Sequence, residues 1–267
     1  MVLGKRGQQF RPGRISSMPK SKRKYQPTDY GKGYNPKQAI GKRKIPPGAE
    51  HKFHEDGANA TTLQNVSTNH FPAYSIFSTL LNIDQGDGMN NRNGNKIMID
   101  QITIRGGVSI DPHQDADVTH TLYTTVFYRV ILYVDTQCNG AGVTSDVFFD
   151  TTLQSQDSFN VFNNLYNSGR FKILMDKRIT VNPNPTFMNT TETPDKIFCT
   201  GGAVQFQKTI KNLAIPVFYS NAQGDLQHIR TNNIGMWVLS VGGGGGNIPD
   251  NTHRKFAYRF RARFYDY

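Results

Sequence analysis

The chain has 267 residues, of which 36% are hydrophobic and 11% aromatic, enough for the core of one large β domain or two small ones. No run of about 18 apolar residues marks a membrane span, and no apolar stretch resembles the core of a secretory signal peptide. The two cysteines, Cys138 and Cys199, form no CxxC pair, so they predict neither a disulfide framework nor a zinc site. We therefore expect a folded protein of the cytosol or nucleus, with no membrane partner.

The net charge of +11 is concentrated in the first fifth of the chain. Residues 1–52 hold fourteen Lys or Arg against two acids, which gives +12, whereas residues 53–267 carry −1. The basic segment is rich in Pro and Gly and almost lacks Val, Leu and Phe, so it cannot bury enough apolar surface to offset the entropy of ordering it. We predict a disordered polycationic arm over residues 1–56 and a folded domain over residues 57–267.

A dozen net positive charges on a flexible tether predict sequence-independent, salt-sensitive binding of nucleic acid, because each neutralised phosphate releases counterions. Fully extended, 52 residues reach about 170 Å. Tyr25, Tyr30 and Tyr34 lie between the basic residues and are suited to stack on unpaired bases. The residues expected to bind nucleic acid are Lys5, Arg6, Arg11, Arg14, Lys20, Lys22, Arg23, Lys24, Lys42, Arg43 and Lys44.

Two parts of the arm also resemble nuclear-import signals, PKSKRKY and GKRK. The import candidates are Lys20, Lys22, Arg23, Lys24, Lys42, Arg43 and Lys44. A solubility tail, or an import signal alone, is the alternative function of the arm. A charge block of this size is usually an interaction tail, which favours nucleic-acid binding.

The polar run GDGMNNRNGN precedes the first regular strand. We expect Gly86, Gly88 and Gly94 to permit a tight turn that directs the chain from the arm into the folded domain. Arg92 and Lys96 would then lie at the rim of the domain. There they would be either solvated or in contact with a neighbouring subunit or nucleic acid.

Beyond this turn the apolar residues alternate with a period of two, which predicts β-strands. Ile97 and Ile99 lie in one phase and Ile102 and Ile104 in the other, so one strand with a β-bulge at residues 100–101 is expected.

A second strand over residues 126–134 would bury its even positions. We therefore expect Val130→Asp to be far more destabilising than Arg129→Asp. Further strands are predicted in RFKILMDKRITV, AVQFQKTIKNLAIPVFYS, IGMWVLSV and KFAYRFRARFYDY, with one or two helical turns at most around DTTLQSQDSFNVFNNLY.

The last predicted strand has two unlike faces. Arg259, Arg261 and Arg263 alternate with aromatic and small residues, which indicates a half-buried strand with a cationic outer face. That face would line an interior or contact a neighbouring subunit, or it would form ordinary cross-strand salt bridges. Short strands, turns rich in Gly, Asn, Asp and Pro, and long connections together predict an all-β fold, a single jelly-roll β-sandwich of about eight antiparallel strands.

Catalytic and metal-binding patterns find little support. HKFHED lacks HExxH spacing, DQGDG lacks the distal Glu of a calcium loop, and GGGGG has no following Lys and Ser or Thr. We expect a protein that is not an enzyme and binds no cofactor or metal.

Four blocks resemble, in order, those of coat proteins from viruses with small circular single-stranded DNA genomes, the geminivirus, genomovirus and circovirus-like group. The blocks are QGDGMNNRNGNKIMIDQITIRGGV, SFNVFNNLYNSGRFKILMDKRITV, FQKTIKNLAIPVFY and NNIGMWVLSV…KFAYRFRARFYDY, covering residues 82–267. The arm lies where that family keeps its own. It is richer in Lys than circovirus arms, and the Cys/His cluster of some geminivirus coats is missing, so the subfamily and the choice between DNA and RNA stay open.

The resemblance implies a capsid protein that assembles with itself into an icosahedral shell and packages a single-stranded, circular DNA genome through the arm. It also implies localisation in the virion and in the host nucleus, and partners in the host import machinery and an unknown receptor. Alternatives are the coat of a small RNA or satellite virus, a cellular basic nucleic-acid-binding protein, and a jelly-roll enzyme or lectin. A near-neutral domain behind a detached basic arm favours the capsid protein.

Overall fold

The structure is a computed structural model that describes residues 50–62, 74–111, 113–115, 126–138, 140–150, 164–182, 185–190, 193–199, 201–242 and 254–266. Nearly all of the regular structure in these residues is β-strand. The strands are β1 (Lys52–Thr62), β2 (Tyr74–Thr79), β3 (Lys96–Ile110), β4 (His113–Asp115), β5 (Val126–Asp135), β6 (Phe171–Val181), β7 (Pro185–Thr190), β8 (Thr193–Cys199), β9 (Gly202–Tyr219), β10 (Ile229–Thr231), β11 (Asn233–Gly242) and β12 (Arg254–Asp266). A short helix α2 (Ser145–Phe148) and two 3-10 turns, η1 (Leu165–Asn167) and η2 (Leu226–His228), complete the described elements.

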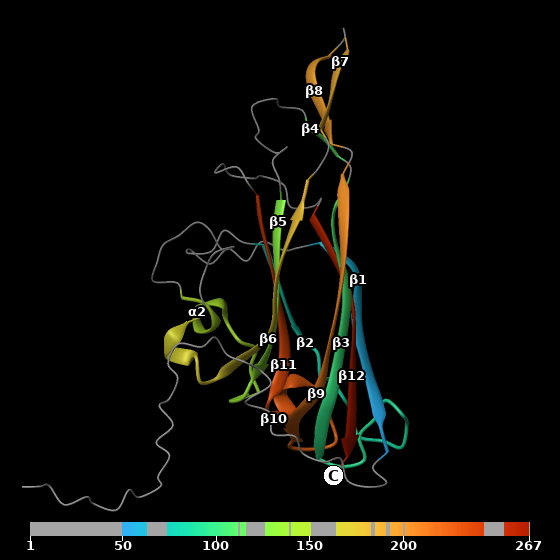
Figure 1. The fold of residues 1–267 in the computed structure, drawn as a ribbon, viewed down its shortest axis with the longest axis vertical. Coiled ribbons are helices and arrows are strands. Elements are labelled where there is room, and N and C mark those ends of the chain that lie inside the picture. The colour runs from blue at the N-terminus through green and yellow to red at the C-terminus, as the bar shows by residue number, and fades with distance from the viewer. Residues whose placement is uncertain are drawn as a thin grey trace, which may run out of the picture. The chain divides into compact units, whose positions relative to one another are not determined.

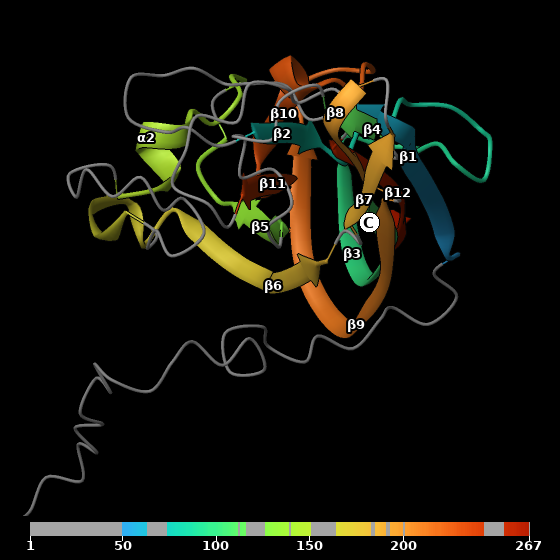
Figure 2. The ribbon, with the colours of Figure 1, turned by 90° about the horizontal axis from the view of Figure 1, so that it is seen from above.

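Two antiparallel sheets form a β-sandwich (Figures 1 and 2). The first sheet has the order β1-β12-β3-β9-β10, and the second has the order β2-β11-β5-β6. The long strands pair in a nested manner, β1 with β12, β2 with β11, β3 with β9 and β5 with β6, so the first strand meets the last. This is the strand order of a jelly roll, and the predicted fold class is confirmed. The short strands β4, β8 and β7 form a separate sheet.

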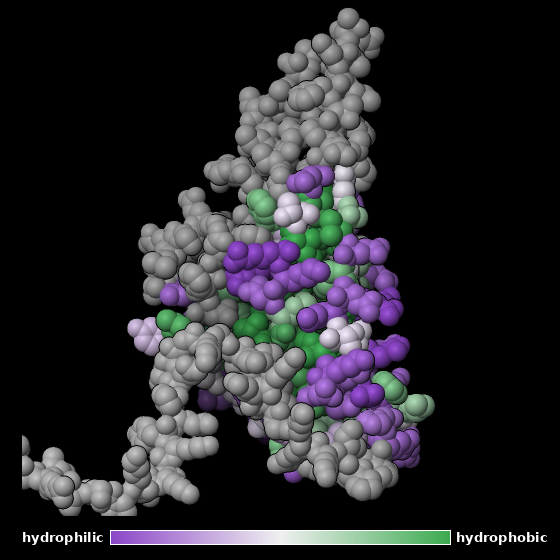
Figure 3. Space-filling model, in the orientation of Figure 1, coloured by the Kyte–Doolittle hydropathy of each residue, from purple (hydrophilic) through white to green (hydrophobic). Residues whose placement is uncertain are grey.

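The main core lies between the two sheets and follows the alternation of the strands. Ile102 and Ile104 of β3, Val130 and Leu132 of β5, and Phe260 of β12 are all fully or almost fully buried there. Hydrophobic side chains are visible between the sheets in Figure 3, whereas hydrophilic ones cover the β1 and β12 side. Burial of this apolar surface contributes most of the favourable free energy of folding of the sandwich.

A second core covers the outer face of the β2-β11-β5-β6 sheet. Tyr133 of β5 packs on Phe148 of α2 with ring centroids 4.6 Å apart, and Phe149 packs on Trp237 of β11 at 5.7 Å. Figures 1 and 2 both show α2 on the side of this sheet that faces away from β3 and β9. Both faces of β5 are therefore buried, where the sequence indicated a single core face.

The predicted bulge in β3 is confirmed. Ile99 pairs with Phe264 of β12 and Gln101 pairs with Arg263, so Asp100 is the extra residue between two successive partners. Its carboxylate is 7% exposed and accepts bonds from the Arg263 guanidinium at 2.6–3.0 Å. The unpaired bulge position thus carries a side chain that is satisfied across the sheet.

The sandwich begins earlier than expected. β1 starts at Lys52, and its first five residues, up to Asp56, already pair with β12. These residues lie inside the segment 1–56 that the sequence assigned to the arm. Two further strands, β2 and β10, had no alternating apolar pattern to indicate them. The helical turns expected around residues 150–166 fall largely on residues outside the described ones. α2 ends just before this segment, and η1 overlaps its end at Leu165 and Tyr166.

The structure removes the basis for expecting a mild effect at Arg129. Arg129 is 5% exposed, and its Nε and Nη2 donate to the two carboxylate oxygens of Asp176 on β6 at 2.9 and 2.6 Å. The Asp176 side chain is 35% exposed, so a substitution of Arg129 breaks a partly buried ion pair, and we now expect a substantial loss of stability.

We predict that Val130→Asp lowers the free energy of unfolding by about 4 kcal/mol, because it buries a charge with no partner between the sheets. Arg129→Asp should lower it by about 3 kcal/mol, since it sets a carboxylate against Asp176. Urea denaturation of both variants would measure these values. The charge-swapped pair Arg129→Asp/Asp176→Arg should recover part of the loss, and a swap no more stable than the single variant would contradict the role given to this ion pair.

Candidate nucleic-acid interface

The eleven arm residues expected to bind nucleic acid, and the seven import candidates among them, lie outside the described residues. The five other predicted site residues are on the sandwich. The structure places Arg92 and Lys96 at one end of it, and Arg259, Arg261 and Arg263 on the outer face of the β1-β12-β3-β9-β10 sheet.

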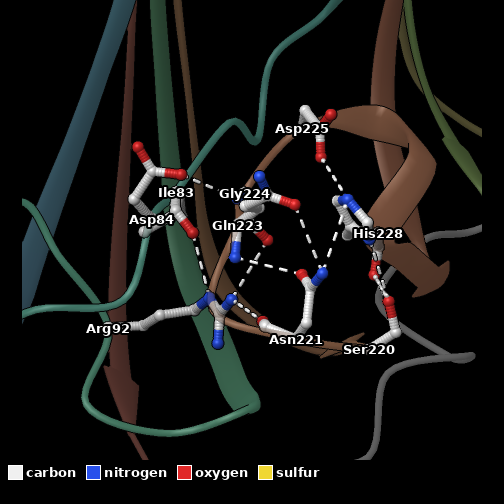
Figure 4. A network of polar contacts seen from close by, with 9 residues as sticks. All are labelled: Ile83, Asp84, Arg92, Ser220, Asn221, Gln223, Gly224, Asp225 and His228. Atoms are coloured by element: carbon white, nitrogen blue, oxygen red, sulfur yellow. Dashed lines mark hydrogen bonds and ion pairs between the residues drawn. The ribbon is translucent and has the colours of Figure 1, made fainter.

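Arg92 is not at the surface. Its side chain is fully buried, and all five of its N–H donors have acceptors. Nε donates to the carbonyl of Ile83 at 2.9 Å, and Nη2 donates to the carbonyls of Asn221 and Gln223 (Figure 4). Nη1 donates to the carbonyl of Gly94 and to Oδ1 of Asn95. Both the solvated position and the interface position expected for Arg92 are therefore wrong, because the surrounding loops use its guanidinium to satisfy their own carbonyls.

The Arg92 charge is compensated mainly by dipoles. Its guanidinium carbon lies 4.1 Å from the ring centroid of Tyr219, a cation–π contact. Burial disfavours the charged form of both groups. It therefore lowers the pKa of Arg92 from its usual value and raises the pKa of Tyr219. Because arginine is not deprotonated in proteins, the guanidinium stays charged in spite of this shift.

Two loops are joined around Arg92 by hydrogen bonds from backbone amides. The amide of Gly224 donates to Oδ1 of Asp84 at 2.7 Å, and the amide of Gln85 donates to the carbonyl of Ala222 at 2.8 Å (Figure 4 shows the first of these). A Cβ on Gly224 would come closer than 3 Å to the backbone of Ile83. The close approach of the two backbone segments therefore requires a glycine at position 224.

The glycines of the polar turn do not lie where the arm enters the domain. Gly86, Gly88 and Gly94 lie in the loop between β2 and β3, after two strands of the sandwich, so the expected passage from arm to domain at this turn is wrong. Among the described glycines only Gly140 and Gly201 have a positive φ. Lys96, at the start of β3, places its ammonium 4.9 Å from the ring centroid of Phe218 and is partly buried.

The cationic face of β12 is confirmed, and two of its arginines are neutralised across the sheet. Arg259 and Arg261 are exposed and Arg263 is partly exposed, while the residues between them are buried. Arg261 forms an ion pair with Glu55 of β1, and Arg263 forms one with Asp100 of β3. For these two residues the cross-strand alternative describes the structure.

Arg259 differs from its neighbours. Its Nη2 donates to Oδ1 of Asn59 at 2.9 Å, a neutral group, and its side chain lies across Gly57 of β1. Directly opposite Arg259 on β3 is Arg105, an exposed residue that the sequence analysis did not single out. Within the described part of the chain the side chain of Arg105 forms no hydrogen bond or ion pair. The alternation of ITIRGG showed that Arg105 faces outward, but only the register of β3 against β12 places it beside Arg259.

Two adjoining hollows lie on this outer face. One has a volume of about 550 Å³ and the other about 410 Å³, and Arg105, Gln207 and Arg259 line both. Gly107 and Ala257 form part of the lining of the larger hollow. We call the combined feature the arginine groove.

The metal-like patterns of the sequence are dispersed by the fold. In β1, His54 is buried whereas Glu55 is exposed on the outer face, so HKFHED does not converge on one point. Over the residues that the structure describes, no three His, Cys, Asp or Glu side chains gather as metal ligands. None of the described helices is long and apolar enough to cross a membrane.

The chain matches no known protein family and no curated protein. Among solved structures, that of the infectious bursal disease virus Gx strain is 11% identical, with 81% of this chain and 42% of that one covered and a TM-score of 0.15. The VP2 subviral particle of the same virus is also 11% identical, with 80% and 41% covered and a TM-score of 0.13. The chain spans about two fifths of the length of these structures. Likeness at such TM-scores does not establish a shared fold, so the function is inferred from the chain's own residues.

We predict that Arg92→Gln lowers the free energy of unfolding by about 3 kcal/mol, because several buried carbonyls lose their donors. Arg92→Lys should cost nearly as much, since an ammonium has three donors and lacks the planar fork of a guanidinium. Arg230→Gln, on the exposed face of β10, is the control and should change stability by less than about 0.5 kcal/mol. Thermal unfolding would test this, and an Arg92→Lys variant as stable as the control would contradict it.

The close approach at Gly224 gives an independent test of the same loops. Gly224→Ala should destabilise the domain by about 2 kcal/mol, because backbone atoms must move to admit the methyl group. Gly94→Ala is the matched control, since a Cβ there meets nothing within 4 Å. Equal denaturation midpoints for the two variants would show that the loops separate freely.

Proposed function

We propose that this protein is a viral capsid protein that assembles into an icosahedral shell and packages a single-stranded, circular DNA genome through its basic arm. The observation that supports this most strongly is the separation of charge from fold. Residues 50–267 contain a jelly-roll sandwich and carry a net charge of −1, while residues 1–49 carry +12. A protein that bound nucleic acid through its folded surface alone would not need this separation.

The topology supports a tiling role for the sandwich. The ends of β3, β6 and β11 and the starts of β5, β9 and β12 lie at one end of the sheets, because Ile110 pairs with Gly202 and Arg254, and Val126 pairs with Val181 and Gly242. Three connections, residues 111–125, 182–201 and 243–253, therefore leave from that end. Long connections on a rigid scaffold are the usual carriers of contacts with partners. Repeated heterologous contacts with closed symmetry would assemble copies into a shell.

The arm supplies the packaging energy in this proposal. Lys and Arg side chains neutralise phosphates and release counterions, and many arms inside one shell repel each other unless a polyanion offsets their charge. The resemblance of the four sequence blocks supports DNA as that polyanion. It also supports import through the basic clusters of the arm, assembly in the host nucleus and a final location in the virion. No catalytic step is part of this function.

Negative-stain electron microscopy and sedimentation of the purified protein, with nuclease digestion of its contents, test the proposal. We expect closed particles that protect single-stranded DNA. A full-length variant with the eleven arm residues replaced by Gln should lose the protected DNA. Its binding to single-stranded DNA should also depend less on salt. A plot of the logarithm of the binding constant against the logarithm of the salt concentration should have a slope smaller by about 8, because each of the eleven lost phosphate contacts contributes about 0.7.

Two outcomes would redirect the assignment. Protected RNA in place of DNA would favour the coat of an RNA or satellite virus. A monomer at every protein and salt concentration, with and without added DNA or RNA, would contradict the capsid function and favour a cellular nucleic-acid-binding protein.

A further inference from the structure

The arginine groove contains positive charge that the fold itself does not use. Arg105 and Arg259 occupy directly opposite positions on adjacent antiparallel strands. Like charges in this relation destabilise a sheet, because their Cβ atoms are only about 5 Å apart. The only acid among the lining residues of the two hollows is Glu55, and Arg261 already pairs with it. The two facing arginines are therefore left without a carboxylate from the described chain.

The next two outward-facing pairs along the same strands, Arg261 with Thr103 and Arg263 with Gln101, are built differently. Arg263 pairs with Gln101 in the register and binds Asp100, whose carboxylate is mostly buried. Arg261 has Glu55. Neutralisation by an acid is thus available on this face, and it is present at two of the three outward-facing arginines of β12. The remaining one, Arg259, has no acid among the described residues and lines both hollows, which indicates a site for an external anion.

The shape of the groove fits an extended chain. Arg259, Arg105 and Gln207 lie side by side on β12, β3 and β9, so they form a row across the strands with a spacing of about 4.8 Å. Small residues, Gly107 and Ala257, leave the surface beside the row low. A Cβ on Gly57 would lie 2.8 Å from Nη1 of Arg259, so the glycine lets this side chain lie flat over β1.

We propose that the arginine groove binds the phosphodiester backbone of single-stranded nucleic acid, as a second contact separate from the arm. Each guanidinium offers a planar pair of donors that matches two oxygens of one phosphate. The amide of Gln207 supplies a neutral donor and acceptor for the sugar or the next phosphate. Lys211, exposed on the same face two outward positions further along β9, adds positive charge to one side of the row.

The charge of the chain itself favours nucleic acid over an acidic segment of a second copy. The sandwich has scattered acids, whereas a row of fixed positive charges is best matched by evenly spaced phosphates. The arm, at +12, is repelled by the groove and attracted by the same strand, so arm and groove would hold one polyanion together. The identity of the strand rests on the proposed function, while the groove is tested separately.

Replacing the eleven arm residues by Gln in the full-length protein removes most of the binding by the arm, so the contribution of the groove can be measured. Binding of a labelled oligothymidine would be measured across a salt series in this background. Adding Arg105→Gln/Arg259→Gln should reduce the salt slope by about 1.4, two contacts at about 0.7 each, and weaken binding on the order of tenfold at 0.1 M salt. Arg230→Gln, which removes one charge at the other end of the same sheet, is the control and should leave both unchanged.

Two further readouts distinguish a binding site from a structural role. The Arg105→Gln/Arg259→Gln variant should unfold at the same temperature as its parent or at a higher one, because a repulsive pair has been removed. Oligothymidine containing 4-thiothymidine, cross-linked to the wild-type protein by ultraviolet light, should label peptides of β3, β9 or β12.

An unchanged salt slope, or cross-links on the sandwich only outside these strands, would overturn the proposal. Competition by polyglutamate at lower concentrations than by oligothymidine would also overturn it and assign the groove to an acidic peptide. Loss of particles without loss of groove binding would count against the capsid function alone.

Discussion

A buried guanidinium holds one end of this sandwich together. Arg92 directs its five donors to oxygens of two loops, residues 83–95 and 221–223, that are far apart in the chain. The first loop leads into β3 and the second leads out of β9, and these two strands pair in the first sheet. Close to the first loop, the amide of Leu80 donates to the carbonyl of Ile234 at the start of β11, which belongs to the second sheet. A charge placed out of water is costly unless every donor is satisfied, so the loops have one arrangement in which Arg92 is tolerated. Arg92 thereby ties the loop that enters β3 to the loop that leaves β9 at this end of the sandwich.

Much of the fold was predictable because most strands bury one face. Alternating apolar residues identified β3, β5, β6, β9, β11 and β12, and the change of phase at Asp100 identified the bulge. β1 was missed because its inward positions include Lys52 and His54, which are buried but polar, so no hydrophobic alternation indicated a strand. The second face of β5 was misjudged for a related reason. Ile131 and Tyr133 are covered by residues around α2 and Phe171, a tertiary contact that a local pattern does not contain.

The candidate site shows where sequence reasoning stops. Charge counting alone defined the basic segment, since composition needs no structure, and its role as an arm stays a prediction because residues 1–49 lie outside the described ones. For Arg92 it failed, because an arginine among Gly and Asn residues has the composition of a solvated turn. Two of its five acceptors, the carbonyls of Asn221 and Gln223, lie more than a hundred residues away in the sequence. The cationic face of β12 followed from alternation alone. Which of its arginines are neutralised depended on the partners Glu55 and Asp100, and the neighbour of Arg259 depended on the register with β3.

The pairing of the first strand with the last has a consequence for folding during synthesis. β1 leaves the ribosome before any other strand of the sandwich, yet its partner β12 begins almost two hundred residues later, a delay of about 10 to 40 s at 5–20 residues per second. Contacts of such high sequence separation form slowly, because the loop must close before the strands bind. During this interval the edge of β1 is unpaired and open to other chains. Lys52, His54, Glu55 and Asp56 give it the charged, polar character that discourages edge-to-edge aggregation, so the same composition that concealed β1 in the sequence protects it until the chain is complete.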